Sequence, residues 1–338
     1  MKVIEHELNL NLNCPESICH LTEDTILFDI ETTGFSAKTS QLYMIGAAVL
    51  VDDILHITQY LAQSKEDEAF LLIAFYNLCK QYSSCITYNG LGFDIPYLEE
   101  KAKLLKVNET LSLLEKVDIY KELKPFKHIL KLMDLKQKTV EQFLGINRED
   151  LYTGGELISH YMNYSKTGNL DEEKLLLLHN YEDILGMAYL LPVLSYLKVF
   201  QGEYTFESAS QTTSVDYYGN EEERLVIEAT LSLPVPVPVS YRRFDYYLSL
   251  RGNKLYLSST MYDGQIKVPY LNYKDYVYLK NEDIAVLKDM ARYVEKESKI
   301  PATPETSYGK FRITKESLCK ETLEPYIQTI LQLLCNLK

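Results

Sequence analysis

The sequence predicts an α/β protein with two domains: a mixed β-sheet flanked by helices, and then a smaller α+β domain with antiparallel hairpins. Strand-type segments come first and helical segments follow, and a hairpin adjoins a strand–helix crossover, which is typical of a mixed sheet covered by helices. After about residue 200 the chain becomes polar, and short strand-type segments with Gly-containing turns follow. The length of 338 residues allows two cores. We therefore expect domains at residues 1–200 and 201–338.

Runs of apolar and β-branched residues between turn residues indicate the strands of the first domain. The clearest run is Thr25–Glu31, which precedes a Thr-Thr-Gly turn. Leu42–Val51 and Ile54–Leu61 indicate a hairpin around two aspartates. We also expect an edge strand or arm within residues 1–24, and short strands at Cys85–Tyr88 and Val117–Tyr120.

Helices are indicated by apolar residues at helical spacing and by capping residues. A Thr139–Gln142 capping box opens one helix, which Gly145 ends, and Asn169 caps the longest helix. Pro192 and Gly186 are expected to bend that last helix. The predicted helices are Lys65–Tyr82, Phe93–Lys106, Thr139–Gly145, Leu157–Lys166 and Leu170–Leu197.

The second domain is predicted to be a small antiparallel sheet with two helices. Gln201–Asp216 is rich in Ser, Thr and Gln and marks the boundary, and Pro234–Pro238 must be extended but cannot be a central strand. Turn residues predict two hairpins, around Gly252-Asn253 and around Asp263-Gly264. We expect a strand at Leu225–Leu231, and helices from Asn281 to about Glu297 and from Thr314 to Leu337.

Composition limits the classes of protein that this chain can be. A net charge of −13 argues against coating nucleic acid non-specifically, but it does not exclude an enzyme that holds one strand end. No apolar run approaches the roughly 20 residues of a membrane helix, and the N-terminus lacks the apolar core of a signal peptide. The scattered cysteines predict free thiols and a cytoplasmic protein: Cys14, Cys19, Cys79, Cys85, Cys319 and Cys335.

Two carboxylates end the first buried strand. Asp29 and Glu31 are two positions apart in a strand, so their side chains share one face, with Ile30 on the other. Like charges in an apolar setting repel, and a divalent cation is a common remedy. The alternative is a strand end with solvated acids. Further acids downstream decide between these readings.

Three more residues complete a set that can carry chemistry. Asp94 follows a strand and lies in the first turn of a helix, in Tyr88-Asn89-Gly90-Leu91-Gly92-Phe93-Asp94. His179 and Asp183 are four positions apart on a helix and share one face. The set then holds four carboxylates and one titratable base. Carboxylates favour hard Mg²⁺ or Mn²⁺ over zinc.

The segments FDIETTG, YNGLGFDIPYL and HNYED resemble, in order and separation, the three motifs of the DEDD 3′–5′ exonucleases of the ribonuclease H-like superfamily. KLMDLKQKTVEQFLGI and LYTGGELISHY are most similar to the YprB-like ribonuclease H-like proteins. The resemblance covers residues 25–197 and implies a ribonuclease H-like fold. It also implies a two-metal hydrolase that releases 5′-mononucleotides from single-stranded DNA or RNA 3′ ends.

The resemblance implies a role for each matching residue. Asp29 would bridge two Mg²⁺ or Mn²⁺ ions, Glu31 and Asp183 would complete the first site, and Asp94 would hold the second. The Thr32 backbone would lie near the terminal 3′ hydroxyl, and His179 would be the general base. His179 departs from the family pattern, because the histidine branch places it five positions before the aspartate and the tyrosine branch has a tyrosine at four. Tyr181 would face elsewhere on the helix. A structural role for His179 is the alternative.

Other features allow two readings each. Asn89 could bind the substrate or support Asp94, or its role could be confined to the local backbone. The lysines of residues 101–138 could receive phosphates, although solvated helix faces are the simpler reading. The basic and tyrosine-rich residues 241–280 could stack the bases of a single strand.

A second function of another class is a catalytically retired, nucleic-acid-binding or scaffold protein on the same fold. Retirement would usually show as lost carboxylates, and all four are present. Endonucleolytic cleavage is a third possibility. The sequence does not distinguish DNA from RNA and indicates no protein partner.

Overall fold

The computed structural model describes residues 1–9, 21–215 and 219–336, so Cys14, Cys19 and the part of the predicted N-terminal arm at residues 10–20 lie outside the described residues. The chain forms two compact units. The first comprises Met1–Lys124 and Leu132–Leu194, and the second comprises Pro125–Lys131 and Ser195–Lys338. The domains expected at residues 1–200 and 201–338 remain a prediction, and residues 125–131 and 195–200 belong to the second compact unit.

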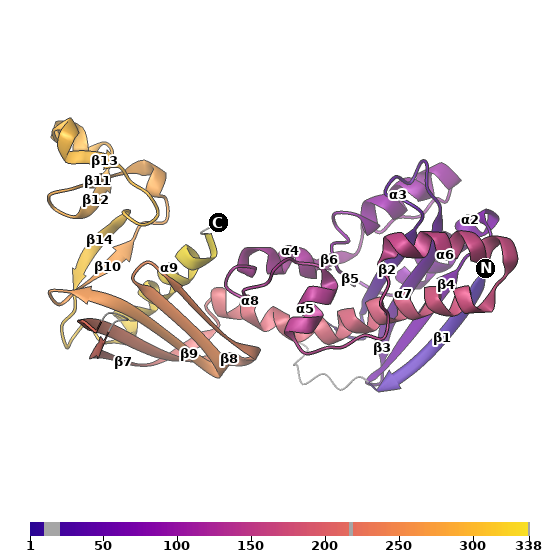
Figure 1. Ribbon diagram of the computed structural model, residues 1–338, viewed down its shortest axis with the longest axis horizontal. Helices are drawn as coiled ribbons and strands as arrows, with labels where there is room; N and C mark the ends of the chain where they lie inside the picture. The colour runs from indigo at the N-terminus through magenta and orange to yellow at the C-terminus, as the bar shows by residue number, and fades with distance from the viewer. Residues whose placement is uncertain (10–20, 216–218, 337–338) are drawn as a thin grey trace. The chain divides into compact units, whose positions relative to one another are not determined.

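The first unit is built on a six-stranded mixed sheet with the strand order β1-β4-β3-β2-β5-β6 (Figure 1). Its strands β1 to β4 pair antiparallel, whereas β2–β5 and β5–β6 pair parallel. The strand bounds are β1 Lys2–Asn9, β2 Thr25–Thr32, β3 Leu42–Val51, β4 Ile54–Leu61, β5 Ser84–Thr87 and β6 Glu115–Asp118. The strand β2 therefore lies in the interior of the sheet.

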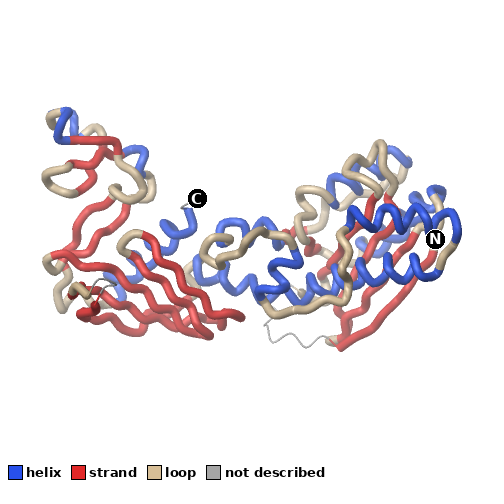
Figure 2. Tube along the Cα trace, in the orientation of Figure 1, coloured by secondary structure: helices blue, strands red, loops and turns tan. Residues whose placement is uncertain are grey.

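Helices cover both faces of this sheet (Figure 2). Phe28 of β2 meets Phe75 of α2 edge to face on one side, with ring centroids 5.0 Å apart. On the other side α7 packs so closely that a Cβ at Gly46 would lie 2.2 Å from the side-chain oxygen of Asn180. The helix bounds are α2 Glu68–Cys79, α3 Asp94–Leu105, α4 Ile119–Leu123, α5 Gln137–Phe143, α6 Gly154–Thr167 and α7 Leu170–Leu190.

Most predicted elements of the first domain are present, and three differ. Asp118 caps α4, so the last strand ends two residues early. The helix α5 begins after Lys136, which replaces Thr139 as its N-cap. Pro192 converts the chain to a 3₁₀ turn at Leu191–Leu194 before α8, Ser195–Phe200, so the long helix is interrupted. The capping box that does form is Thr153 with Glu156, at the start of α6.

The helical segment Leu170–Phe200 corrects one expectation from composition. By length and composition it is apolar enough to cross a membrane, and 67% of its most apolar window is buried inside the protein. The core helix of a globular protein has the same composition. Since α7 packs on β2, β3 and β4, we interpret this segment as a core helix.

The second unit contains a five-stranded antiparallel sheet, ordered β14-β10-β9-β8-β7, and a three-stranded sheet, ordered β12-β11-β13. The helix α9, Lys320–Asn336, contacts β10 and β7, and Tyr326 on it donates a hydrogen bond of 2.8 Å to Ser259. The strand bounds are β7 Tyr204–Val215, β8 Glu221–Arg243, β9 Tyr246–Tyr262, β10 Gln265–Pro269, β11 Tyr276–Leu279, β12 Ile284–Leu287, β13 Lys299–Pro301 and β14 Tyr308–Arg312.

Several predictions for the second domain are wrong. The polar segment that was taken to mark the boundary contains the strand β7, which pairs antiparallel with β8. Gly252 pairs with Val235 across an irregular register inside β9, so no turn forms there. The predicted helix after Asn281 is replaced by β12 and short 3₁₀ turns. The last helix begins at Lys320 rather than Thr314.

Two other predictions hold. Asp263 and Gly264 have positive φ angles of 49° and 72° and form the turn between β9 and β10. Pro234–Pro238 is extended, and although β8 is central in the sheet, its pairing with β7 ends at Leu231. The prolines therefore do not have to donate backbone hydrogen bonds to β7. The predicted fold class, a mixed sheet flanked by helices followed by an antiparallel α+β domain, is confirmed.

Candidate active site

Asp29 and Glu31 project from the end of β2 toward α7. Asp29 pairs with Gly46 in the antiparallel register, and Gly46 is the residue over which α7 packs. Residues directly opposite in an antiparallel pair share a face, so both acids point to the α7 side. The register shifts between Glu31 and Thr32. Glu31 is only 7% exposed.

Asp94 reaches this pair from the first residue of α3. Its Oδ1 accepts a hydrogen bond of 3.2 Å from the backbone N–H of Ile30. The parallel pairing of β2 with β5 ends at Leu27, so the carboxylate takes a donor that β5 does not reach. Asp94 is 5% exposed, and this hydrogen bond ties it between the two acids of β2.

His179 and Asp183 come from α7. The Nε2 atom of His179 lies 3.2 Å from Oδ2 of Asp183 and 3.6 Å from Oε1 of Glu31. His179 is 5% exposed, and the Asp183 side chain is 17% exposed. Tyr181 instead lies against His6 of β1, with ring centroids 4.8 Å apart. The predicted shared face of His179 and Asp183, and the different direction of Tyr181, are both confirmed.

The crowding of these carboxylates raises their pKa values. Burial raises the pKa of Glu31 to about 8, with Asp183 and Asp94 adding to the rise. Burial likewise raises the pKa of Asp94 to about 7. The pKa of Asp29 is well above its ordinary value because of burial and of the charges on Asp94 and Asp183. The cluster therefore favours any group that brings positive charge.

The pKa of His179 responds to the same charges in the opposite sense. Burial by itself lowers it, but Asp183, Glu31 and Asp150 raise it, and the net direction is upward from 6.5. A neutral ring can accept a proton at the nitrogen that faces the acids.

The donor set fits a divalent cation. One ligand atom each from Glu31, His179 and Asp183 lie within 4.8 Å of one another. Asp29 and Asp94 add two carboxylates whose raised pKa values record unneutralised negative charge. Oxygen-rich sites of this kind suit Mg²⁺ and Mn²⁺. His179 could serve there either as a ligand or as a base beside the ion.

Two residues that the sequence analysis missed hold His179 and Asp183 in place. Arg148 forms ion pairs with Asp183 and with the buried Glu141. Asp150 lies 2.7 Å from Nδ1 of His179. Both belong to the loop between α5 and α6, and the only sequence signal was the charged run Arg148-Glu149-Asp150. Such runs are usually solvated, so this signal was too weak to use.

Thr32 directly follows Glu31 at the end of β2, and Asn89 lies in the turn between β5 and α3. Asn89 has a left-handed backbone with φ of 62°, and its carbonyl accepts hydrogen bonds from Gly92 and Phe93. This geometry agrees with the local role and leaves its contact with substrate a prediction. The Thr32 hydroxyl donates to the Gly34 carbonyl at 2.9 Å. Beyond it, Phe35 is 92% exposed and meets Phe93 edge to face, which places an open aromatic ring close to the loop that follows Glu31.

The predicted lysine and tyrosine surfaces divide into structural and open residues. Lys101 is buried and pairs with Glu68 at 3.0 Å. Lys254 and Lys267 pair with Glu207 and Asp245. Arg242 and Arg243 are exposed and lie over the rings of Tyr247 and Phe244.

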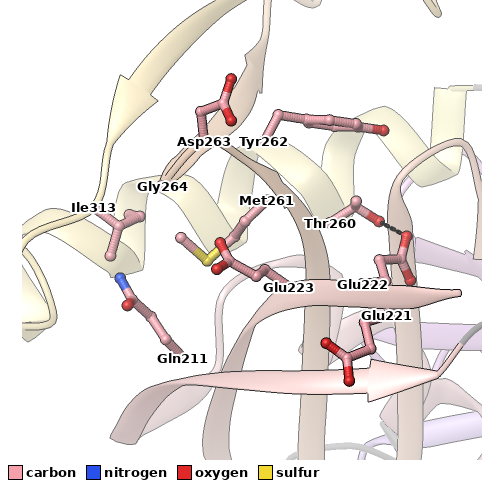
Figure 3. Close-up of a pocket in the computed structure, with 10 residues that line it drawn as sticks. All are labelled: Gln211, Glu221, Glu222, Glu223, Thr260, Met261, Tyr262, Asp263, Gly264 and Ile313. Atoms are coloured by element: carbon pink, nitrogen blue, oxygen red, sulfur yellow. Dashed lines mark hydrogen bonds between the residues drawn. The ribbon is translucent and has the colours of Figure 1, made fainter.

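A pocket of about 690 Å³ opens in the second unit beside the β9–β10 turn. Figure 3 shows three consecutive glutamates of β8 and the turn residue Asp263 around it, with Glu222 bonded to Thr260. None of the described residues that line it is basic. Negative walls repel a phosphate backbone, so this pocket is a poor place for nucleic acid.

Several solved structures of nucleic-acid enzymes match this chain at low identity. The family B DNA polymerase from the hyperthermophilic archaeon Pyrobaculum calidifontis matches with a TM-score of 0.41 and 20% identity, covering 51% of this chain and 25% of the polymerase. A structure of exonuclease I with the inhibitor BCBP matches at 0.31 and 9%, covering 61% and 55%. The zinc-bound E. coli ExoI–ssDNA complex matches at 0.30 and 10%, covering 92% and 69%. This chain thus spans a quarter of the polymerase and about half of the inhibitor-bound exonuclease.

No curated protein matches the sequence. A family model described as the RNase_H superfamily matches residues 26–195, half of the chain. That range contains all five clustered residues, the four acids and His179. The chain therefore belongs to the RNase_H superfamily.

Proposed function

We propose that this protein is a metal-dependent 3′–5′ exonuclease of the DEDD type, closest to the YprB-like group, acting on single-stranded DNA or RNA. The observation that carries the proposal is the convergence of Asp29, Glu31, Asp94, His179 and Asp183 from β2, α3 and α7. Three distant segments supply four carboxylates and one base to one partly buried cluster. Burial of so many like charges costs free energy, which a purely structural site would have no reason to keep.

Asp29, Glu31, Asp94 and Asp183 would hold two divalent cations, Mg²⁺ or Mn²⁺. When bound, such ions lower the pKa of a water molecule and stabilise the charge that develops on a phosphate during in-line displacement. Arg148 keeps one oxygen of Asp183 occupied and thereby fixes the direction of the other. Residues that orient a ligand in this way commonly tune a metal site.

His179 would act as the general base. Its Nε2 faces Glu31 and Asp183, where an attacking water would lie, and it would take one proton from that water. The Thr32 backbone and Asn89 would contact the terminal nucleotide. The exposed ring of Phe35 would stack on a base, which any nucleobase permits.

The second unit would contribute a track for the strand. Arg242, Arg243 and Arg251 are exposed near one end of the β8–β9 pair, beside Tyr247 and Phe244. Arginine and aromatic side chains together bind single strands without reading sequence. The exposed lysines of residues 101–138, such as Lys103, Lys106 and Lys121, would add weaker phosphate contacts.

Digestion of DNA and RNA oligonucleotides labelled at either end, with Mg²⁺ or Mn²⁺, tests the proposal. We expect 3′-labelled strands to lose their label as mononucleotide at once and 5′-labelled strands to shorten progressively. Asp29→Asn should abolish cleavage, while Asp171→Asn, an exposed acid on α7 with the same change of charge, should cleave normally.

Three outcomes would contradict the proposal, and each indicates something different. No cleavage by the native chain with either ion would favour the retired, nucleic-acid-binding alternative. Cleavage of a circular single strand would identify an endonuclease. Full activity in Asp29→Asn would place the active site elsewhere.

A further inference from the structure

The loop between α5 and α6 contacts α7 at the segment His179–Asp183. Arg148 pairs with Asp183, and Asp150 lies against His179. The backbone N–H groups of Glu149 and Asp150 both donate to the carboxylate of Glu182, at 2.8 Å each. Three consecutive residues of the loop therefore hold three residues on one stretch of the helix.

Asp150 is held by more than its histidine. Its side chain is only 2% exposed. Oδ2 accepts from Lys138 at 2.8 Å, and Oδ1 accepts from the Tyr152 amide at 3.0 Å. Its backbone N–H donates a hydrogen bond to the carboxylate of Glu182. Hydrogen bonds therefore hold both the backbone and the side chain of Asp150. A carboxylate with these donors around it remains ionised, and hydrogen bonds to the charged form favour that form.

An ionised carboxylate at Nδ1 determines the state of the ring. Because the carboxylate can only accept, Nδ1 of His179 must carry the proton, at 2.7 Å from Oδ2. The neutral ring then has its lone pair on Nε2, the atom that faces Asp183 and Glu31. The nitrogen left to accept a proton is the one in the acid cluster.

We propose that Asp150 is a positioning residue, which fixes the orientation and tautomer of His179 so that Nε2 serves as the base. The inference rests on the proposed nuclease function and adds to it a residue outside the three motifs. Asp150 contacts the ring at Nδ1, whereas Nε2 faces Asp183 and Glu31.

Four variants of the full-length chain test this role: Asp150→Asn, Asp150→Glu, His179→Ala and the double variant that combines D150N with H179A. We expect D150N to lower kcat by about 10- to 100-fold with little change in KM, as loss of a residue behind an active-site ligand commonly does. D150E should recover part of that loss. In the H179A background D150N should cost nothing further. Glu149→Gln is the matched control, since it removes one exposed charge from the same loop, and it should behave as native.

The tautomer can be read without metal or substrate. Nitrogen NMR of histidine-labelled native protein at alkaline pH, with His179 among six histidines assigned by H179A, should show Nδ1 protonated and Nε2 as the unprotonated nitrogen. A native ring protonated on Nε2 would overturn the proposal even if D150N failed to fold. So would native kcat in a folded D150N, or an equal loss with and without His179. An inactive native chain with the expected tautomer would overturn only the nuclease function.

Discussion

Asp29, Glu31 and Asp94 are acids placed where a folded chain would ordinarily place neutral residues. Their pKa values are raised by burial and by neighbouring carboxylates, among which Asp183 acts on all three. The pKa of His179 is raised by the same carboxylates that would bind cations. At this scale the protein without metal is electrostatically strained, and two predictions follow from particular side chains.

The first concerns His179 in catalysis. His179→Ala should lower kcat by about 100- to 10,000-fold, the usual contribution of a general base. Because a base must be neutral to act, the native rate should rise with pH through the pKa of His179, and the variant should lose that rise. Steady-state rates across pH on a single-stranded oligonucleotide measure both effects. His160→Ala, which removes a histidine of α6 bonded to Glu172, is the control, and an unchanged pH profile in H179A would refute the role.

The second concerns the stability of the metal-free protein. Glu31 has its pKa raised from 4.5 to about 8, so the folded state binds its proton more tightly than the unfolded state does. This contribution is fully present below about pH 4.5 and is lost as pH rises toward 8. We expect the free energy of unfolding to fall across that range and the fall to become smaller in Glu31→Gln. Urea unfolding with a chelator present measures it, and identical slopes in both proteins would contradict the prediction.

At the scale of elements, periodicity and turn chemistry predicted what local sequence decides. The strands β3 and β4 have the expected bounds, and the Asp263-Gly264 turn forms because both residues tolerate positive φ. The polar strand β7 and the continuous strand β9 were not predicted, because their strand conformation depends on pairing with residues that are distant in the sequence. Pairing with β8 makes a strand of β7 despite its Ser, Thr and Gln, and it carries β9 straight past Gly252.

The clustering of the acids was predictable because their spacing within each motif is local. Arg148 and Asp150 were not, because their partners lie 35 and 29 positions away on α7. No local pattern distinguishes a charged loop in solvent from one that packs against a helix. The structure was needed to identify Arg148 and Asp150 as residues that contact the third motif.

The packing of α7 on the sheet gives a prediction for Gly46. A Cβ there would meet Asn180 and Ile184 at 2.2 and 2.8 Å, so Gly46→Ala should push the helix outward and destabilise the fold by about 1–3 kcal/mol. Gly155→Ala on α6 adds the same methyl where nothing lies within 4 Å, and it should be neutral or slightly stabilising. Denaturant unfolding of both variants gives the comparison. If Gly46→Ala were as stable as Gly155→Ala, α7 would be able to move away from the sheet without loss of stability.

At the scale of the whole molecule, charge is distributed unevenly for an enzyme that would hold a polyanion. The net charge is −13, so binding must depend on local groups of basic residues, of which Arg242 and Arg243 are the clearest. In Arg242→Gln/Arg243→Gln, single-strand affinity should fall and the slope of log affinity against log salt should decrease by about 1.4, or 0.7 per lost phosphate contact. Arg292→Gln, an exposed arginine paired with Asp289, is the control. An unchanged salt slope would exclude the track.

The segment Pro125–Lys131 belongs to the second unit, although the residues before and after it in the sequence belong to the first. Dividing the chain at one position therefore cannot separate the two units. Phe126 stacks on Phe200, and His128 bonds to the Leu334 carbonyl and meets Tyr241 edge to face. In a fragment of residues 1–200, His128 loses both of its partners, so trypsin should cleave after Lys127 and Lys131 faster than in the full chain. Cleavage after Lys166 and Lys174 should not change. Equal cleavage at all four sites would show that the segment needs nothing after residue 200.

The same segment sets an order of events during synthesis. His128 leaves the ribosome 206 positions before Leu334, its hydrogen-bond partner. At about 5–20 residues per second, the segment waits about 10 to 40 s while the sheet of the first unit can already form around the residues on either side of it. During that interval Phe126, Ile129 and Leu130, which are buried in the finished protein, have no second unit to cover them. The helix α9 therefore completes a core whose first residues were made about 200 positions earlier.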